Sequence, residues 1–252
     1  MIKSLSIIAC LFLLPFSLGQ AFAYTIEGGV EHVERMPAVA PELRAGAEFN
    51  SETLKTSSGN NWVRVPAFLA GTWLVKNETA VYRKDFKTGK IYQSPLTYKA
   101  RHEFSYGHQQ DRQGGIWHYV GVPYTSETRS SDYTEYHKVS RKDFQVLTDS
   151  EVRFRCLMNV VRVSHYDDDR ISGSFQQESI TSYRPLEDGT IELTSSTKSF
   201  DQAGLPSFET CNNAVIKRSK PFKPVAEKEG KDLRALFNEF LAASGKSNLL
   251  PD

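Results

Sequence analysis

The sequence predicts an all-β domain, built as an antiparallel meander and curled into a barrel or half-barrel, with one α-helix near its C-terminal end. Short runs rich in β-forming residues repeat between Pro66 and about Phe222, and turn signals separate them roughly every ten to fifteen residues. A single helical pattern follows. No sustained helical period occurs within residues 66–222, and hairpins joined by short turns favour antiparallel pairing, since parallel strands need long crossovers.

The first 23 residues have the composition of a signal peptide. Lys3 precedes an apolar run from Leu5 to Leu18, and Ala21-Phe22-Ala23 forms an A-x-A cleavage site. The run is shorter than the ~20 residues of a membrane-spanning helix, so cleavage is favoured over a retained anchor. We therefore expect residues 1–23 to be removed and the protein to be exported, to the periplasm or beyond the cell.

Cleavage would leave a chain without net charge. Of the 31 Lys and Arg residues only Lys3 lies in the signal peptide, and the others match the 30 Asp and Glu residues in number. Such a balance produces no broad field that attracts nucleic acid or an anionic membrane. We expect a soluble protein with no nucleic-acid partner and no membrane insertion after cleavage; the sequence leaves the oligomeric state open.

The expected mature chain keeps two cysteines, Cys156 and Cys211, because Cys10 leaves with the signal peptide. In an oxidising compartment an even pair favours a disulfide. A Cys156–Cys211 bridge would close a loop of about 56 residues and contribute about 3–4 kcal/mol in the chain-entropy model. Two separate buried thiols are the alternative.

Residues 24–65 are predicted to be an extended leader, either draped over the domain or mobile, with one short helical turn near Ser51–Lys55. This segment is rich in Gly, Pro, Ala, Glu, Ser and Asn and lacks periodicity. The leader gives way to the predicted barrel of residues 66–222. Residues 223–252 form a linker and an amphipathic helix.

Several runs alternate as half-buried strands do. In Leu96–Tyr106 the even positions, including His102 and Phe104, form an apolar face, and the odd positions form a polar one. In Glu151–Tyr166 the alternation slips by one residue near Val160–Val161, which predicts a β-bulge there. Such a bend helps a sheet to curl.

The strands predicted at Ile171–Arg184 and Thr190–Phe200 carry Ser, Thr and Gln on both faces. Either this part of the sheet is exposed to solvent on both sides, or one face lines a polar cavity. Exposure is favoured because strands rich in Ser and Thr are common on exposed sheets.

The C-terminal segment has one apolar stripe, formed by Leu233, Leu236, Phe237, Phe240 and Leu241, at positions i, i+3, i+4, i+7 and i+8. Gly245 marks its end. The opposite face carries charges of both signs, so we expect the helix to pack across the outside of the sheet and not on a membrane surface.

The sequence gives little support for catalysis or for a bound cofactor. Residues 171–175, "ISGSF", lack the spacing of a nucleophile elbow, and phosphate-binding and dinucleotide-binding motifs are missing. His102 and His118 would form a metal or hydrolase site only if a carboxylate joined them. Because histidines on apolar faces are more often core residues, we predict no catalytic residue, no metal site and no cofactor.

Aromatic residues concentrate in the first half of the predicted sheet, which favours a binding site for a flat or apolar ligand. For each of these aromatic residues, the alternative is that its side chain only fills the hydrophobic core. The residues predicted to contact such a ligand are Tyr98, His102, Phe104, Tyr106, Trp117 and His118.

The opening of the sheet, Gly71-Thr72-Trp73, resembles the Gly-x-Trp motif in the first strand of lipocalins and their calycin relatives. In that family the Trp closes the base of the barrel and a basic residue from the last strand packs over it. The resemblance implies a lipocalin-like barrel, a structural role for Gly71 and Trp73, and the covering role for Arg218. "SSDYTEY" (130–136) lies too far from Arg218 to be the family's second motif.

The sequence thus favours an exported protein that binds a small apolar or aromatic ligand inside a β-barrel. A non-catalytic envelope module that binds a partner is the alternative, with the polar strands 171–200 as its surface. A histidine-dependent hydrolase is a third.

Overall fold

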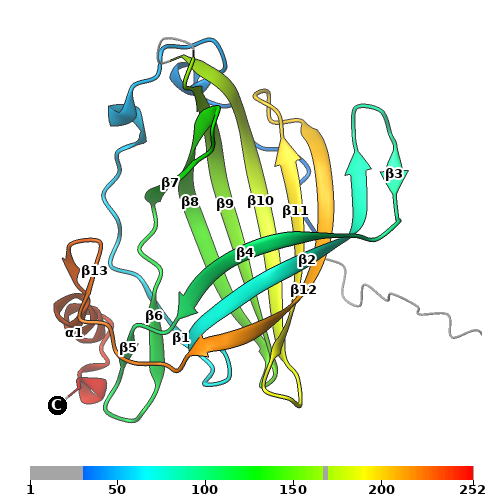
Figure 1. Ribbon diagram of the computed structural model, residues 1–252. Helices are drawn as coiled ribbons and strands as arrows, with labels where there is room; N and C mark the ends of the chain where they lie inside the picture. The colour runs from blue at the N-terminus through cyan, green and yellow to red at the C-terminus, as the bar shows by residue number, and fades with distance from the viewer. Residues whose placement is uncertain (1–30, 167–169, 252) are drawn as a thin grey trace, which may run out of the picture.

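The computed structural model describes residues 31–166 and 170–251, and it is an antiparallel β-structure with one α-helix (Figure 1). The large sheet curls but does not close, so the predicted meander half-barrel is confirmed. The signal peptide expected at residues 1–23 lies outside the described residues, so its removal stays a prediction.

The large sheet has the strand order β3-β2-β12-β11-β10-β9-β8-β7, and β4 also pairs with β2. The chain runs from β7 to β12 through successive hairpins, and β12 then returns to pair with β2. Strands β4 and β7 share no ladder in the described part of the chain, which leaves the half-barrel open between them. The strands of this sheet are β2 (Gly71–Asp85), β3 (Ile91–Tyr92), β4 (Leu96–Tyr106), β7 (Tyr124–Arg129), β8 (Tyr133–Thr148), β9 (Glu151–Ser164), β10 (Ile171–Pro185), β11 (Ile191–Phe200) and β12 (Pro206–Lys220).

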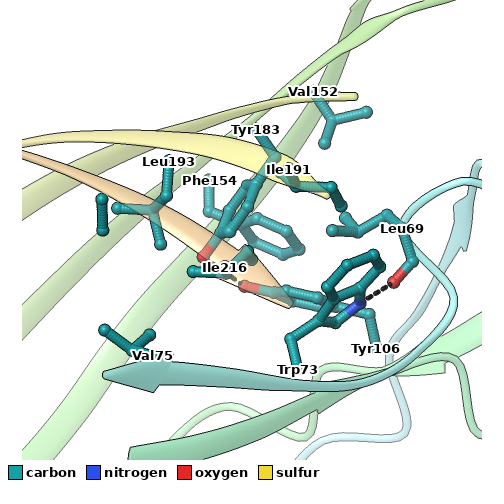
Figure 2. Close-up of a cluster of buried hydrophobic side chains, with 11 residues drawn as sticks. Leu69, Trp73, Val75, Tyr106, Val152, Phe154, Tyr183, Ile191, Leu193 and Ile216 are labelled. Carbon is teal, nitrogen blue, oxygen red and sulfur yellow. Dashed lines mark hydrogen bonds between the residues drawn. The ribbon is translucent and has the colours of Figure 1, made fainter. Parts of the chain in front are cut away.

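The end of the half-barrel nearest β1 is closed by a packed apolar core, shown in Figure 2, to which Leu69, Trp73, Tyr183 and Ile216 belong. The indole N–H of Trp73 donates to the Leu69 carbonyl oxygen at 2.7 Å. Apart from Leu69, which precedes β2, the side chains of this core come from β2, β4, β9, β10, β11 and β12, so the core joins strands from both halves of the large sheet. We call the sheet face that carries Trp73 the inner face.

Arg218 of β12 lies over Trp73, with its guanidinium carbon 4.5 Å from the ring centroid. The guanidinium also donates to the carbonyl oxygens of Phe68, at 2.8 Å, and Ala70. Gly71 has φ +125°, and a Cβ there would lie 2.7 Å from the Lys220 carbonyl oxygen, so only glycine fits. The Gly-x-Trp motif and Arg218 therefore meet in the arrangement that the lipocalin resemblance implies.

The bulge expected at Val160–Val161 is absent, because β9 keeps continuous register with β8 and β10 across both residues. The register between β9 and β10 shifts instead between Ile171 and Gly173. Val160 and Val161 are both fully buried although they point to opposite faces. The apolar residues change face because the leader covers Val161 from outside, packing Val39 and Leu43 against it.

The leader covers the outer face of β10 and β11, which corrects the expected solvent exposure of these strands. It contains two 3-10 helices, Pro41–Leu43 and Ser51–Leu54, the second at the helical turn expected there. Backbone bonds at 3.0 and 2.9 Å join Met36 and Val39 to the turn after β11. Polar side chains on the outer face of these strands form hydrogen bonds with the leader. The Gln176 side-chain amide, for example, donates to the Pro37 carbonyl oxygen at 2.7 Å.

A second, three-stranded sheet has the order β1-β6-β5, formed by β1 (Trp62–Val65), β5 (Gln109–Gln110) and β6 (Ile116–Tyr119). Strand β1 lies in the segment that the sequence assigned to the leader. A short hairpin, β13 (Glu227–Lys228) with β14 (Lys231–Asp232), leads into helix α1 (Leu233–Ala243), and a 3-10 helix, Ser247–Leu249, follows.

Helix α1 forms as its apolar stripe predicts, but it packs against the small sheet and not across the large one. Leu233, Phe237 and Leu241 are buried in a cluster with Trp62 and Trp117. The Asp232 carboxylate accepts the Ala235 N–H at 2.9 Å and caps the first turn. After the last turn, Gly245 adopts the left-handed conformation (φ +69°).

The predicted disulfide is wrong: Cys156 and Cys211 are free thiols. Cys156 of β9 pairs with Ser179, Ser179 with Thr197, and Thr197 with Thr210 of β12. Three strand spacings separate the cysteines by roughly 14 Å, whereas a disulfide needs Cα atoms about 4.4–6.8 Å apart. Cys211 is also next to Thr210 along β12, so its side chain points to the opposite face of the sheet.

Candidate functional site

Three of the six residues predicted to bind a ligand come together on the inner face. The ring centroids of Phe104 and Tyr106 are 5.5 Å apart, and those of Tyr106 and His118 are 5.2 Å apart. Tyr106 also stacks on Phe154 at 4.8 Å. Phe104 stays half-buried, and so does Phe144, which packs on Phe154 with 4.6 Å between ring centroids. This aromatic cluster therefore presents ring surface that is only partly covered.

The other three predicted residues lie elsewhere. Trp117 faces away from the large sheet, packs against Phe237 of α1, and donates its indole N–H to Asp111 at 2.8 Å. His102 is exposed, and its ring lies 6.0 Å from that of Phe104. The alternation that placed His102 on an apolar face holds along β4, but β4 is an edge strand, so most of it stays exposed.

Tyr98 is 40 % exposed at the far end of β4. Its hydroxyl donates to the Glu78 carboxylate at 2.9 Å. Partial burial and the hydrogen bond to Glu78 raise the pKa of Tyr98 to about 12. Tyr98 is therefore separated from the aromatic cluster, and its hydroxyl already has a partner.

Tyr106 and Tyr183 share a buried hydrogen bond, with 2.8 Å between the two hydroxyl oxygens. Burial raises the pKa of Tyr106, and the neighbouring Tyr183 raises it further. Burial also raises the pKa of Tyr183 to about 12. Both phenols are therefore neutral donors and acceptors at any physiological pH.

His108 and His118 form a stacked pair beside these rings, with centroids 4.5 Å apart. Nδ1 of His108 accepts the Tyr119 backbone N–H at 2.9 Å, which fixes this nitrogen as unprotonated. Burial, aided by the charge of Lys228, lowers the pKa of His108 to about 3. Burial lowers the pKa of His118 well below its usual value too. Two neutral imidazoles are therefore held at the inner face.

Nδ1 of His118 is buried and has no hydrogen-bond partner in the described ranges, 31–166 and 170–251. Its side chain is held rigidly, since the residue is only 4 % exposed and packs on Tyr106 and His108. A buried polar atom without a partner costs about 1–3 kcal/mol. Such an atom calls for a partner from outside the described residues, which a water molecule or a bound ligand would supply.

Lys142 of β8 extends this site, with its ammonium nitrogen 5.4 Å from the centroid of Phe154. It lies opposite Cys156 in the β8–β9 register. Burial lowers the pKa of Lys142, and so does the charge of Lys228, whereas Cys156 opposes the shift. Lys142 forms no ion pair with Asp or Glu in the part of the chain that the structure describes.

Cys156 and Tyr124 complete the group, and both are half-buried. Burial raises the pKa of the Cys156 thiol, although Lys142 opposes this. Burial and the proximity of Cys156 raise the pKa of Tyr124 to about 12. We refer to these residues as the inner-face cluster, which consists of His108, His118, Tyr124, Lys142 and Cys156.

Sequence reasoning found only His118 of this cluster as a ligand contact. His108 follows Gly107, whose left-handed turn (φ +84°) between β4 and β5 carries it toward His118. Lys142 and Cys156 are neighbours only through strand pairing, which no local pattern reveals. A lysine two residues before Phe144, on the same face of β8, was the signal available.

A second polar cluster lies on the outer face under the leader. His32 connects the Ser196 hydroxyl, 2.8 Å from Nε2, to the Glu178 carboxylate, 2.9 Å from Nδ1. Glu178 is fully buried: its Oε2 also accepts the Val33 N–H at 2.7 Å, and its Oε1 accepts bonds from Nε and Nη2 of Arg155. We call this group the Glu178 cluster.

The Ser196–His32–Glu178 chain has the connectivity of a catalytic triad, but its setting does not suit hydrolysis. Ser196 is only 8 % exposed, beneath the leader. It lies in the middle of β11, which is paired on both sides, so its neighbours' N–H groups serve the ladder and not an oxyanion. The cluster therefore anchors the leader.

The two histidines of the sequence-based metal and hydrolase hypotheses do not share a carboxylate. Neither His102 nor His118 bonds an Asp or Glu within residues 31–166 and 170–251. Among those residues, no group of three or more His, Cys, Asp or Glu side chains is placed to hold a metal ion.

Three surface hollows, with volumes of about 830, 610 and 420 Å³, lie away from the six predicted residues. The first runs between residues 51–58 of the leader and strand β7, and Tyr124 forms part of its wall. The hollow borders the inner-face cluster only through Tyr124. We place the candidate site at the inner-face cluster because the perturbed pKa values and the unpartnered nitrogen gather there.

These features define a single-sheet half-barrel whose open inner face carries an aromatic and basic cluster. Comparison with protein-family models, with curated proteins and with solved structures found no match for this chain. No helix in the described portion is long and apolar enough to cross a membrane.

Proposed function

We propose that the protein binds a small apolar or aromatic ligand on the inner face of the half-barrel. The single observation that carries the proposal is the buried, unpartnered Nδ1 of His118 at the border of the aromatic cluster. An apolar ligand body would rest on the half-buried rings of Phe104 and Phe144, and a polar end would reach His118. This is the common composition of ligand sites, with apolar walls and a few polar groups that set orientation.

The openness of the sheet supports access to this site. In the described residues β4 and β7 share no ladder, and the half-buried rings of Phe104 on β4 and Phe144 on β8 belong to the aromatic cluster. Further from the closed end, the inner face carries half-buried hydroxyls, among them Ser179 and Thr197, which share a hydrogen bond at 3.2 Å. These hydroxyls would suit polar substituents of the ligand.

Export is part of the proposal and rests on residues 1–23 alone. The free thiols of Cys156 and Cys211 do not contradict it, because strand pairing keeps them apart in any redox environment. Mass spectrometry of the protein from the periplasm and the medium of expressing cells tests it. We expect a chain that begins at Tyr24; full-length chain in the cytoplasm would contradict export.

Titration with N-phenyl-1-naphthylamine, a neutral aromatic probe that fluoresces in apolar surroundings, tests ligand binding. We expect a saturable rise in probe fluorescence with a quench of tryptophan emission. Ser179→Phe, which places a ring on the inner face beside Cys156, should weaken binding at least tenfold. Thr194→Phe is the matched control, because Thr194 is exposed on the outer face of the adjacent strand.

Lack of any saturable response in the folded wild-type protein would overturn the proposal. Equal binding by both variants would place the probe outside the half-barrel and overturn it as well. In either case the partner-binding alternative would gain support.

A further inference from the structure

We propose that the ligand of the inner face carries an acidic group, and that the Lys142 ammonium binds this group with His118 as a second contact. The inference rests on the proposed ligand site and names the chemical class of its occupant. A carboxylate, sulfonate or phosphate on an aromatic or apolar body shares the required chemistry.

The first support is geometric. Both Lys142 and His118 lie against the ring of Phe154: the ammonium nitrogen is 5.4 Å from its centroid, and the imidazole centroid is 6.3 Å from it. A ligand body that covers the half-buried ring of Phe144, which packs on Phe154 with 4.6 Å between ring centroids, would bring a terminal acid to this side of both polar groups.

The second support is the lack of any internal counter-ion. Neither Lys142 nor His118 forms a hydrogen bond or an ion pair with an Asp or Glu in the described part of the chain. A half-buried ammonium without a carboxylate is unusual, because burying an unpaired charge is costly. Lys228 adds a second positive charge that acts on Lys142, His108 and His118.

The contrast with other lysines of the sheet strengthens this point. Lys138, on the same strand, donates to the Thr53 carbonyl oxygen at 2.9 Å, and Lys198 donates to the Val33 carbonyl oxygen at 3.0 Å. Both bond the leader. Lys142 is half-buried without such an acceptor among the described residues, which is expected when the acceptor comes from a ligand.

His118 can donate a hydrogen bond to an acidic ligand group or accept one from it, because the tautomer decides which ring nitrogen carries the proton. A neutral imidazole with the proton on Nδ1 donates to an anion without carrying charge. The low pKa of His118, caused first by burial, keeps this neutral form at physiological pH. The positive charge that attracts the acid therefore comes from the lysines.

A matched pair of probes tests the inference. 1-Anilinonaphthalene-8-sulfonate has the same ring system as N-phenyl-1-naphthylamine and adds a sulfonate. We expect the folded wild-type protein to bind the sulfonate probe about tenfold more tightly, which corresponds to about 1.4 kcal/mol. Lys142→Met should remove this preference, so that the two probes bind with equal affinity.

Two further variants keep the test decisive. Lys142→Arg retains the positive charge and should retain the preference for the sulfonate. Lys99→Met removes a lysine that is exposed on β4 and should leave both affinities unchanged. Circular dichroism of each variant checks that the fold is kept, and Lys142→Gln, which also removes the charge, takes the place of Lys142→Met if that variant does not fold.

The outcomes separate the two proposals. Equal affinity of the wild-type protein for both probes, or an equal loss of both in Lys142→Met, overturns the acid inference and leaves an apolar binding site. Failure of both probes to bind overturns the proposed function together with the inference.

Discussion

The two buried polar clusters of this protein, one on each face of the same sheet, differ in how their charges are satisfied. On the outer face, Glu178 is fully buried and receives bonds from His32, Val33 and Arg155. On the inner face, Lys142 and His118 have no such partners in the described ranges. Completed networks specify a structure, whereas incomplete ones mark places where another molecule is expected.

The difference follows from what covers each face. The leader lies on the outer face and supplies His32 and the backbone groups that β10 and β11 need. In the described residues, the inner face is contacted instead by the small sheet, whose His118 packs on Tyr106 and on Phe154 of β9 without supplying a carboxylate to Lys142. The polar residues of the outer face therefore act in folding, and we propose that those of the inner face act in binding.

The largest expected effect is the loss of the Glu178 carboxylate. Glu178→Ala leaves the Arg155 guanidinium, His32 and the Val33 N–H without their buried acceptor, and should lower the free energy of unfolding by about 3–5 kcal/mol. Urea unfolding followed by circular dichroism measures this. Glu187→Ala, at an exposed turn residue, is the control and should change stability by less than ~0.5 kcal/mol. A comparably small effect of Glu178→Ala would contradict the claim that the outer-face cluster stabilises the fold.

A pH dependence should separate the two clusters. His108 and His118 stay neutral in the folded protein because burial lowers their pKa values, to about 3 for His108. The unfolded chain binds protons at these residues below about pH 6.5, so stability should fall from pH 6.5 to 5, by on the order of 2 kcal/mol for His108. The stability that the Glu178 carboxylate provides should be lost only at lower pH, where this carboxylate is protonated.

The reason for the later loss lies in the sign of the Glu178 shift. Burial alone would raise the pKa of Glu178, but the bonds from Val33, Arg155 and His32 outweigh burial and lower it. The stability that this carboxylate provides is lost as the pH falls below about 4.5 and through the lowered value. His118→Phe should flatten the slope between pH 6.5 and 5, and the exposed-site control His102→Phe should not. An unchanged slope in His118→Phe would contradict the assignment.

A smaller effect of opposite sign is expected at Lys142. Lys142→Met removes a half-buried ammonium that has no carboxylate partner, so it should raise the free energy of unfolding by about 1 kcal/mol. Chemical unfolding at pH 7 without added ligand measures it, with Lys99→Met as the control. Destabilisation by Lys142→Met would mean that the ammonium is satisfied within the fold.

The smallest expected effect concerns the cysteines. Because Cys156 and Cys211 lie on opposite faces and three strands apart, reducing agent should leave the melting temperature unchanged, and Cys211→Ser should behave likewise. A mass of the intact protein that is lower by about two hydrogens, or a melting temperature that falls on addition of reductant, would show that the disulfide forms after all.

Local patterns predicted the parts of the fold that depend on local chemistry. The alternation in Leu96–Tyr106, the stripe on α1 and the Gly-x-Trp motif at Gly71 are all read from neighbouring residues. The disulfide failed because pairing cysteines by count ignores which strands lie between them. The bulge near Val160 failed because burial on the second face came from the leader, a segment without periodicity.

The same limit explains what was missed at the candidate site. Phe104, Tyr106 and His118 were predicted as ligand contacts because aromatic and histidine residues stand out in the sequence, whereas Lys142 looks like any strand lysine. Its position against Phe154 depends on the β8–β9 register. Trp117 lies apart from the other rings because its four-residue strand presents this face to a helix more than a hundred residues later.

The most direct test follows the imidazole nitrogens of both clusters by NMR while 1-anilinonaphthalene-8-sulfonate is added to the folded protein. We predict that the His118 Nδ1 resonance shifts with saturation as it gains a hydrogen-bond partner, while the His32 resonances, already bonded to Glu178 and Ser196, stay in place. An unmoved His118 resonance, or equal shifts in both histidines, would contradict the assignment of binding to the inner face.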